Sequence, residues 1–377
     1  MLKHVSCILQ FTLFIYLNSI GQKISLGKPL ILVPSGKIPS KIKIQKSNNN
    51  VDVILFKETY YMAFRTGAHH FPNKKSKLYI LRSKDLNKWE YETEISLGND
   101  VREPRWIEFN NRLFLYYFEG GRCPLQFQPQ HIWVSYPLDS GLWYSQIIQG
   151  MDGFVPWRLK SYDNYILMSA YWGKDLYGNH KGELRLFKSF DGLSWRPISE
   201  KPQVSANGAE EGEFEFDNEG NLWACVRLEG EGSLICYAPK NSLHQWTSFK
   251  SKRKYDSSCM FNHNNNIYLV ARRNLDGEFS KAPAWFPYSL KKFYNLIRYS
   301  LTAKTTALYK LNKTLKEFEW LIDLPGCGDN AFPKILSKSP NKFLLFNYSN
   351  DFNKPLIPWL VGQLKKTFIY FMEIDIQ

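Results

Sequence analysis

Three acidic residues, Glu210, Glu211 and Glu213, stand close together, and Arg227 follows sixteen residues after Glu211. Enzymes that cleave glycosidic bonds usually use two carboxyl groups, one protonating the leaving oxygen and one stabilising or attacking the anomeric carbon. On a strand, Glu211 and Glu213 would share one face and Glu210 would point elsewhere. Repulsion among three carboxylates would raise the pKa of at least one, which suits an acid. A solvated acidic loop is the alternative interpretation.

Further acids stand where predicted strands begin, and arginines stand where the following strands end. These acids are Asp52, Glu103, Asp256 and Asp329, and the arginines are Arg65, Arg227 and Arg272. A guanidinium group binds a carboxylate or sulfate through two parallel hydrogen bonds. We therefore predict Glu211, Glu213 and Glu103 as catalytic candidates, with the other acids and the three arginines binding an anionic sugar. The alternative is that each arginine pairs with a neighbouring acid and only stabilises the fold.

Histidine and aromatic residues supply further candidates for substrate binding. His69 and His70 follow Arg65 closely, and a histidine there could act as a general acid or base near neutral pH. Simple solvent exposure is the alternative for both histidines. Trp172 and Trp285 could stack on sugar rings, and Tyr348 ends a predicted strand near Asp329. We predict no cofactor and no metal site, because no ligand spacing typical of zinc or calcium occurs.

Regularly spaced tryptophans indicate the elements that position these residues. Trp89, Trp143, Trp195, Trp246 and Trp320 lie 54, 52, 51 and 74 residues apart, and a polar turn precedes a short strand at each. Such a period is typical of stacked repeats. Six predicted hairpins share one pattern, a strand, a tight polar turn and a second apolar strand: Val51 to Arg65, Glu103 to Tyr117, Val155 to Tyr171, Glu211 to Arg227, Asp256 to Arg272 and Asp329 to Tyr348.

This pattern predicts an all-β fold, a six-bladed β-propeller of four-stranded antiparallel blades. The last segment lacks its outer strand, so we expect the N-terminal stretch from Ile24 to Val33 to complete it and close the ring. In a propeller the inner strands start, and the second strands end, on one face beside the axis. The acids and arginines should therefore meet in one basin, with an aromatic insertion from Asp276 to Leu296 in its wall.

Length and composition agree with one large exported domain. The 377 residues are 44% hydrophobic and 16% aromatic, enough to bury a sizeable core. Residues 1–21 resemble a secretory leader, which leaves residues 22–377 as a single domain, secreted, periplasmic or on the cell surface. The net charge of +14 favours acidic glycans as partners. No nucleic-acid motif accompanies the lysines and no apolar stretch is long enough to span a membrane, and we expect a monomer.

Two turns carry a resemblance to a known family. Ser83 to Trp89 and Ser189 to Trp195 look like Asp-box turns, and with six segments the chain resembles the sialidase superfamily of propellers. The resemblance implies that Glu211 and Arg227 sit together, and that Arg272 and Arg65 match further family arginines. The chain departs from the family where Asn49-Asn50-Val51-Asp52 replaces Arg-Ile-Pro, where no aspartate follows Arg65, and where Gly328-Asp329-Asn330-Ala331 occupies the place of the tyrosine nucleophile.

A second resemblance leads to the same chemistry. Ser83 to Trp89, followed by Arg102-Glu103-Pro104, is similar to the five-bladed furanosidase-like glycoside hydrolases, whose inner-strand carboxylates would correspond to Asp52, Glu103 and Glu211. Our leading hypothesis is an exo-acting glycoside hydrolase for an anionic or complex glycan. A polysaccharide lyase for uronic-acid glycans and a non-catalytic glycan-binding propeller are the alternatives.

Overall fold

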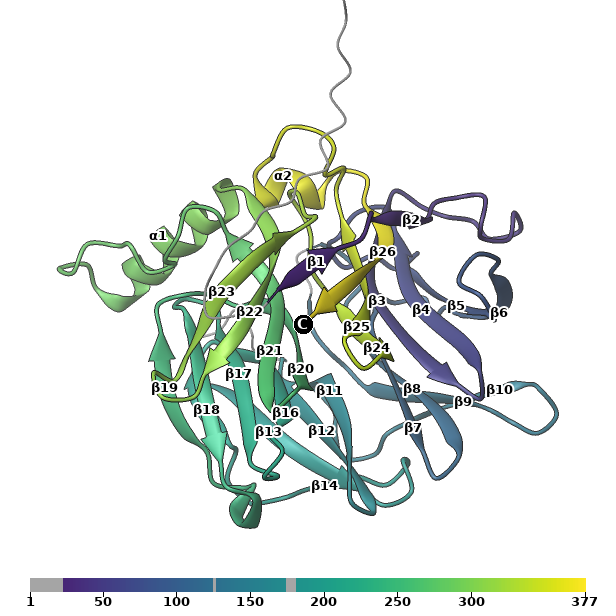
Figure 1. Ribbon diagram of the computed structural model, residues 1–377, viewed down its shortest axis with the longest axis horizontal. Coiled ribbons are helices and arrows are strands. Elements are labelled where there is room, and N and C mark those ends of the chain that lie inside the picture. The colour runs from purple at the N-terminus through teal and green to yellow at the C-terminus, as the bar shows by residue number, and fades with distance from the viewer. Residues whose placement is uncertain (1–22, 125–126, 174–180) are drawn as a thin grey trace, which may run out of the picture.

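The computed structural model describes residues 23–124, 127–173 and 181–377, which form six separate antiparallel sheets with few helices (Figure 1). Each sheet has a run of four strands, and two sheets carry one extra strand. The predicted leader lies outside the described residues. Within the described part of the chain, no helix is long and apolar enough to cross a membrane.

The first three sheets follow one another along the chain. The first consists of β3 (Ser47–Phe56), β4 (Thr59–Gly67), β5 (Lys77–Ser83) and β6 (Glu90–Ile95). The second consists of β7 (Val101–Phe109), β8 (Arg112–Glu119), β9 (Ile132–Pro137) and β10 (Trp143–Ile147). The third consists of β11 (Phe154–Tyr162), β12 (Tyr165–Trp172), β13 (Lys181–Ser189) and β14 (Arg196–Pro197), with β15 (Val204–Asn207) also beside β13.

The other three sheets repeat the arrangement. The fourth consists of β16 (Ala209–Phe216), β17 (Leu222–Leu228), β18 (Ser233–Ala238) and β19 (Thr247–Ser251), with a short 3₁₀ turn at Lys240–Ser242. The fifth consists of β20 (Asp256–His263), β21 (Asn266–Asn274), β22 (Lys304–Asn312) and β23 (Glu317–Leu324). The sixth consists of β24 (Lys334–Ser339), β25 (Lys342–Ser349), β26 (Phe368–Ile376) and β1 (Ile24–Leu26), with β2 (Leu30–Val33) also beside β26.

The first strand of each sheet faces a common axis. β3 contacts β7, β7 contacts β11, and the contacts continue through β16, β20 and β24 back to β3. This closed ring of inner strands defines a six-bladed propeller and confirms the predicted fold, so each sheet is called a blade below, numbered in the order given. The strands nearest the axis therefore position whatever chemistry the axis carries.

The N-terminal strands close the ring as the sequence predicts. β1 pairs antiparallel with β26 in the register Ile24↔Ile376 and Leu26↔Ile374, and β2 pairs with the other end of β26. The last blade is thus built from both ends of the described chain, which leaves β26 without an open edge.

The Asp-box-like turns position the tryptophans through local hydrogen bonds. In the first, the backbone N–H groups of Asn87 and Lys88 donate to Asp85 Oδ1 at 2.9 and 3.0 Å, and Ser83 Oγ donates to the Lys88 carbonyl at 2.6 Å. The turn at Ser189 to Trp195 repeats the pattern around Asp191. The turn directs the buried Trp89 into the core. Trp320 departs from the pattern, because it lies inside β23 and is 38% exposed.

A β-bulge interrupts the start of the inner strand in four blades at the same position. Its first residue has a left-handed backbone: Asn50 (φ 46°), Glu103 (φ 57°), Glu211 (φ 46°) and Ser257 (φ 50°). A left-handed non-glycine residue costs about 1 kcal/mol, and a bulge turns a side chain away from the strict alternation of a strand. The repeated bulge therefore decides which side chains reach the axis.

Beneath the bulges the axis is filled with side chains. The buried Arg105 guanidinium lies 4.5 Å from the ring centroid of Trp157 and 4.0 Å from that of Phe332. The Trp157 and Phe332 rings contact each other at 5.6 Å, although they belong to opposite parts of the ring. This plug forms a floor, so a site at the axis can open only on the side where the inner strands begin.

Two helices lie outside the sheets. Helix α1 (Tyr288–Leu301) falls in the predicted insertion between β21 and β22 and lies at the outer edge of the molecule in Figure 1. Helix α2 (Trp359–Gln363) lies between β25 and β26 and contacts α1. The sequence predicts the place of the insertion but not its helical structure.

Candidate active site at the axis

Arg227, at the end of β17, is the centre of the largest charged cluster. Its Nη1 donates to Glu211 Oε1 at 2.5 Å, and its Nη2 donates to Glu210 Oε2 at 2.9 Å and to Glu229 Oε2 at 2.7 Å. Asp256 Oδ1 lies 3.7 Å from Nε. Burial would lower the pKa of Arg227, but the surrounding carboxylates raise it well above its usual value. Arg227 therefore stays charged and holds carboxylates from two blades together.

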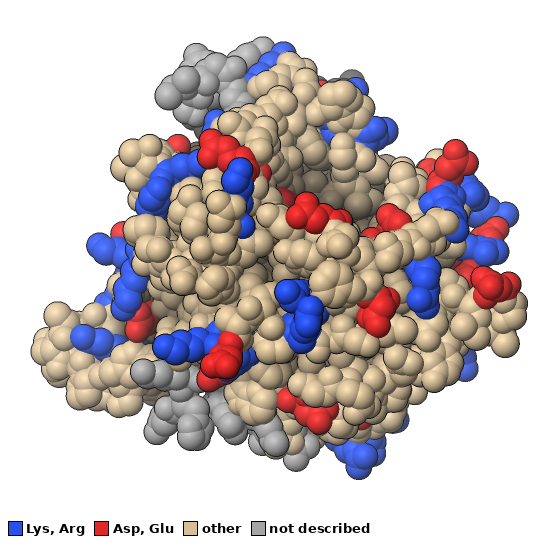
Figure 2. Space-filling model, turned by 90° about the horizontal axis from the view of Figure 1, so that it is seen from below, with Lys and Arg blue, Asp and Glu red and all other residues tan. Residues whose placement is uncertain are grey.

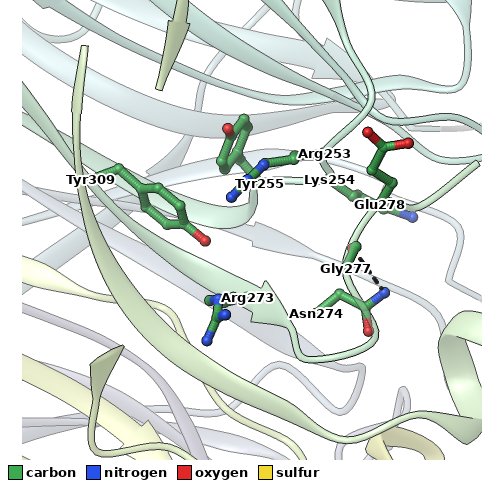
Figure 3. Close-up of a pocket in the computed structure, with 8 residues that line it drawn as sticks. All are labelled: Arg253, Lys254, Tyr255, Arg273, Asn274, Gly277, Glu278 and Tyr309. Carbon is green, nitrogen blue, oxygen red and sulfur yellow. Dashed lines mark hydrogen bonds between the residues drawn. The ribbon is translucent and has the colours of Figure 1, made fainter. Parts of the chain in front are cut away.

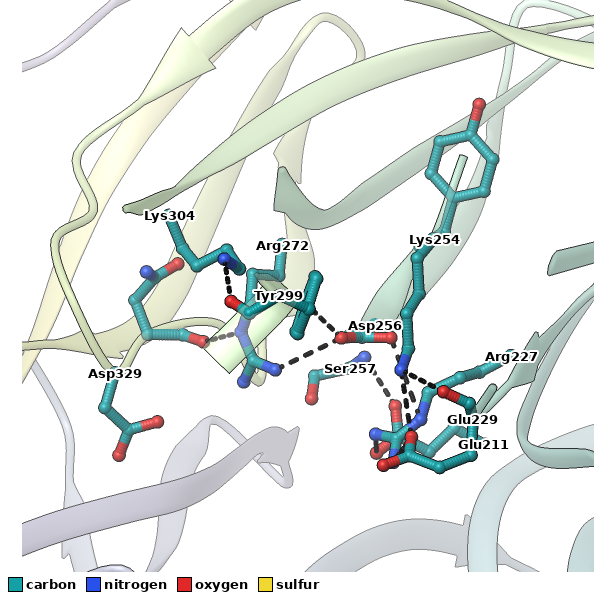
Figure 4. Close-up of polar contacts among 12 residues, drawn as sticks. Glu211, Arg227, Glu229, Lys254, Asp256, Ser257, Arg272, Tyr299, Lys304 and Asp329 are labelled. Atoms are coloured by element: carbon teal, nitrogen blue, oxygen red, sulfur yellow. Dashed lines mark hydrogen bonds and ion pairs between the residues drawn. The ribbon is translucent and has the colours of Figure 1, made fainter. Parts of the chain in front are cut away.

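A second cluster continues from Asp256 across blade V (Figure 4). The Tyr299 hydroxyl, which comes from α1, donates to Asp256 Oδ2, and Arg272 Nη1 lies 3.5 Å from the same oxygen. Arg272 Nε donates to the Asn330 carbonyl at 2.7 Å, and its guanidinium lies 5.3 Å from the Trp359 ring centroid. Arg272 is thus held between blade V, blade VI and α2.

His70, Asp329 and Tyr348 form a third cluster beside Arg272. His70 Nδ1 lies 2.8 Å from Asp329 Oδ2, and the Tyr348 hydroxyl donates to Asp329 Oδ1 at 3.1 Å. Burial lowers the pKa of His70, although Asp329 opposes this effect. Burial alone would raise the pKa of Asp329, but His70, Arg272 and Tyr348 hold it below its usual value. The cluster therefore contains an ionised carboxylate and an imidazole that favours its neutral form.

Glu103, the bulge residue of blade II, is a strongly perturbed acid with a free oxygen, and it shares both properties with Glu210, whose pKa burial also raises to about 8 and whose Oε1 has no hydrogen-bond partner among the described residues. Burial raises the pKa of Glu103 to about 8, and the neighbouring charge of Glu211 adds to this effect. The Oε2 of Glu103 is buried without a hydrogen-bond partner among the described residues. Glu103 is consequently protonated at neutral pH and holds a carboxyl oxygen that no other described group uses.

Glu211 differs from Glu103 in its contacts. Besides the bond from Arg227, the backbone N–H of Ser257 donates to Glu211 Oε2 at 2.6 Å. The pKa of Glu211 is raised by burial and by the charge of Asp256, although Arg227 and the Ser257 N–H oppose this rise. Both oxygens accept strong hydrogen bonds, so of the two bulge acids Glu211 is the better carboxylate.

The predicted pairing of Glu211 with Glu213 is wrong, because the bulge shifts the register between Glu210 and Glu213. Glu210 lies beside Glu211 on Arg227, whereas Glu213 is fully buried in the plug and accepts a hydrogen bond from Arg158 Nε. Asp52 occupies the equivalent position of blade I and is also buried, with Lys334 Nζ at 3.1 Å. Both residues belong to the floor and not to the open side.

Arg65 also lies deeper than predicted. Its side chain is 0% exposed, and its Nη2 donates to Asp100 Oδ1 at 2.7 Å and to the Phe71 carbonyl at 3.1 Å. Asp100 Oδ2 also accepts a hydrogen bond from Arg102 Nε at 2.6 Å. Arg65 therefore stabilises the loop that carries His70 and has no surface for a substrate. Of the three predicted arginines, Arg227 is the most exposed, at 15% of its side chain.

The remaining predicted residues are more scattered. Trp172 ends β12 and packs against Phe154 with ring centroids 5.2 Å apart, at the blade end where the site opens. His69 is partly buried, and its carbonyl accepts a hydrogen bond from Arg65. Trp285 is 80% exposed in the insertion and packs on Phe286. The insertion reaches the axial cluster through Tyr299 instead.

Several residues of the site were not predicted from the sequence. They are Glu210, Glu229, Lys254, Tyr299, Lys304 and Trp359. The repeat could have indicated Glu210, because Asp256 precedes the bulge of blade V in the same way. Tyr299 and Trp359 come from irregular connections, which no repeat pattern places. Lys304 is buried close to other cations of the site, because burial and the charge of Arg272 lower its pKa to about 7.

Charge is not concentrated on the visible surface. On the face shown in Figure 2, basic and acidic side chains are interspersed, without a block of either sign. A cavity of about 180 Å³ lies beside the segment that joins blades IV and V, where Arg253, Lys254, Arg273 and Tyr309 line it (Figure 3). This cavity contains none of the predicted catalytic residues.

Comparison with known proteins supports the fold but not a family. The sequence matches no family profile and no curated protein. Among solved structures, a protein of unknown function from Dyadobacter fermentans is similar, with a TM-score of 0.66, 13% identity and coverage of 94% of this chain and 99% of that one. Trypanosoma rangeli sialidase has a TM-score of 0.60 and 11% identity over 93% of this chain, which spans 59% of the sialidase.

The endosialidase of phage phi92 is similar to the same degree. Its TM-score is 0.60, with 12% identity over 89% of this chain and 68% of the endosialidase. At such identities a likeness carries the fold and not the activity. The chain therefore has a sialidase-like six-bladed propeller fold, in agreement with its Asp-box turns and its ring of inner strands.

Proposed function

We propose that this chain is an exported glycoside hydrolase that removes a terminal sugar from a complex or acidic glycan. The observation that carries the proposal is Glu103, a buried carboxyl group with a pKa of about 8 and one oxygen without a partner among the described residues, close enough to Glu211 for the charge of Glu211 to raise its pKa. Two carboxyl groups whose environments differ in this way are what glycosidic bond cleavage requires.

Each of the two carboxyl groups has a distinct role in this proposal. Glu103 carries a proton at neutral pH and donates it to the oxygen of the leaving group. Glu211 is held as a carboxylate by Arg227 and the Ser257 N–H, and it stabilises the positive charge that develops on the anomeric carbon or attacks that carbon. Glu210, Glu229 and Arg227 then remain to bind sugar hydroxyl groups.

Limited exposure supports action at a chain end. Solvent reaches 18% of the His70 side chain and 22% of the Glu229 side chain, while Glu103 is 6% exposed and the plug closes the other side. A blind site of this kind suits one terminal sugar better than the middle of a polymer. The positive net charge of the whole chain favours encounters with acidic glycans.

Turnover by Glu211→Gln on a panel of neutral and acidic glycans tests the proposal. We expect wild type to release reducing ends and Glu211→Gln to lose roughly 10²- to 10⁴-fold in rate while it keeps its fold, because Glu210 and Glu229 still hold Arg227. Glu219→Gln, at the exposed far end of the same hairpin, is the control and should retain full activity. Undiminished turnover by Glu211→Gln would reject the assignment.

A lyase is the second candidate, and the His70 cluster favours it. A neutral imidazole next to a tyrosine hydroxyl could abstract and return protons during β-elimination of a uronic-acid glycan. The same assay separates the two reactions, since a lyase produces an unsaturated sugar that absorbs in the near ultraviolet and a hydrolase does not.

A further inference from the structure

Helix α1 exposes an apolar face to solvent. Leu290, Phe293, Tyr294, Ile297 and Leu301 are 49, 63, 41, 44 and 58% exposed, and their spacing of three or four residues puts them on one side of the helix. The buried residues of α1, Asn295 and Tyr299, lie on the other side. A surface helix normally buries its apolar face, so this reversed arrangement indicates that something else covers the exposed face.

Helix α2 and the segment before it extend the same apolar surface. Leu356, Leu360, Val361 and Leu364 are exposed by 39 to 54%, and α2 contacts α1. The backbone N–H of Trp359 donates to the Thr302 carbonyl at 3.1 Å, which joins the two helices at their ends. We call the exposed apolar residues of both helices the α1–α2 surface. A groove of about 430 Å³ runs along its α1 side.

The charged residues within the segments that form the α1–α2 surface have one sign, although Asp276 outside these segments ion-pairs with Lys281 and with Arg298 of α1. No Asp or Glu occurs between Glu278 and Glu317, or between Asp351 and Glu373. Lysines stand among the apolar residues throughout both segments, at Lys281, Lys291, Lys292, Lys354, Lys365 and Lys366. Trp285, 80% exposed, stands just before α1. Exposed aromatic and aliphatic residues flanked by lysines are typical of helices that lie in the interface of an anionic membrane.

We propose that the α1–α2 surface binds peripherally to a lipid surface that carries anionic headgroups. Its apolar side chains would enter the boundary between headgroups and acyl chains, and its lysines would contact the headgroups. A second copy of this chain is a poorer occupant, because it would bring the same lysines face to face. The inference does not depend on the proposed hydrolase activity.

Vesicle co-sedimentation of the full chain tests the inference. Wild type should bind vesicles that contain phosphatidylglycerol much more strongly than vesicles of phosphatidylcholine alone, and high salt should weaken the binding. The double variant Phe293→Ser/Leu301→Ser should lose about tenfold or more in affinity, since both side chains supply apolar area to the interface. Lys365→Glu/Lys366→Glu should weaken binding only to the anionic vesicles.

A matched control distinguishes binding through this surface from non-specific adsorption of exposed apolar residues to vesicles. Leu142 and Leu315, 69 and 68% exposed, lie in turns outside both helices, so Leu142→Ser/Leu315→Ser should bind vesicles as wild type does. Equal loss in the control, or unchanged vesicle binding by Phe293→Ser/Leu301→Ser, overturns the inference. A dimer that binds no vesicles and dissociates in the Phe293→Ser/Leu301→Ser variant also overturns it, because it assigns the surface to a second copy.

Discussion

Glu103 and Glu211 occupy equivalent bulge positions but differ in their hydrogen bonds. Arg227 and the Ser257 N–H both donate to Glu211, whereas Glu103 has a buried oxygen without a partner among the described residues. The same backbone geometry therefore produces an acid in one blade and a carboxylate in another. This difference at the scale of single residues carries the proposed chemistry.

The pKa of Glu103 gives a prediction for the pH dependence of the reaction. Glu103 must carry its proton to act as an acid, so the rate of wild type should fall above about pH 8. Glu103→Gln should react slowly at every pH and lose this alkaline limb. The pH profile of kcat/KM measures both effects, and an alkaline limb that persists in the variant would show that another group supplies the proton.

Stability should depend on pH through the same residue. The folded pKa of Glu103 is raised from 4.5 to about 8, so folding takes up a proton between these values and stability declines as pH rises across that range. Glu103→Gln should flatten this decline by up to roughly a few kcal/mol. Urea unfolding of both proteins at about pH 5 and about pH 9 checks the sign. A steeper decline in the variant would contradict it.

For single residues, the sequence predicted well which side chains lie together at the axis. It predicted less well what each of them does there. The three clusters at the axis contain Glu211, Arg227, Asp256, Arg272, Asp329, His70 and Tyr348, and Glu103 lies close enough to feel the charge of Glu211. Glu213 and Asp52 lie outside these clusters, because alternation along a strand fails where a bulge adds a residue. Arg65 also lies outside them, because its guanidinium is taken by Asp100 and by the carbonyls of His69 and Phe71. A bulge depends on pairing with the neighbouring strand, so spacing alone does not reveal it.

Among the elements, α2 has the closest connection to the site. The backbone N–H of His70 donates to the backbone carbonyl of Gln363 at 3.1 Å, and the Trp359 ring packs on the Arg272 guanidinium. Gly362 permits this approach, because a Cβ atom there would overlap the Asp329 nitrogen and Asn350 Oδ1. The short helix thus joins blades I, V and VI at the open side of the axis.

Gly362→Ala should therefore displace α2 and loosen the His70 cluster. We expect a loss of about 1–3 kcal/mol in the free energy of unfolding, together with reduced activity. Gly36→Ala is the matched control, since a Cβ atom at Gly36 has no neighbour within 4 Å. Urea denaturation of both variants measures the difference, and equal stability of the two would show that α2 does not need this close contact.

At the scale of the whole molecule, closure of the ring keeps the axial residues together. The blades were predictable because turn residues and tryptophans repeat along the chain, and the closing strand was predictable because the last segment lacks one. The helices were not, since an insertion interrupts the repeat and follows no pattern of its own. The long-range partners of Glu211 and Arg272 likewise depend on the completed ring.

Leu26→Asp tests the closure. Leu26 packs against the core of the last blade, while Ser25 points to solvent, so we expect Leu26→Asp to lower the free energy of unfolding by roughly 1–3 kcal/mol and Ser25→Asp to change it little. Thermal and urea unfolding of both variants provide the measurement. If Leu26→Asp is as stable as Ser25→Asp, the N-terminal strand does not hold the ring closed.

The most direct test of the axial site is a crystal structure of Glu211→Gln soaked with a glycan fragment that wild type cleaves. We predict a terminal sugar at the open side of the axis, with its glycosidic oxygen within hydrogen-bond distance of Glu103 and its hydroxyl groups on Arg227 and Glu229. A fragment bound only in the cavity lined by Arg253, Arg273 and Tyr309, or on the helices, would contradict the assignment of the axial carboxyl groups as the catalytic pair.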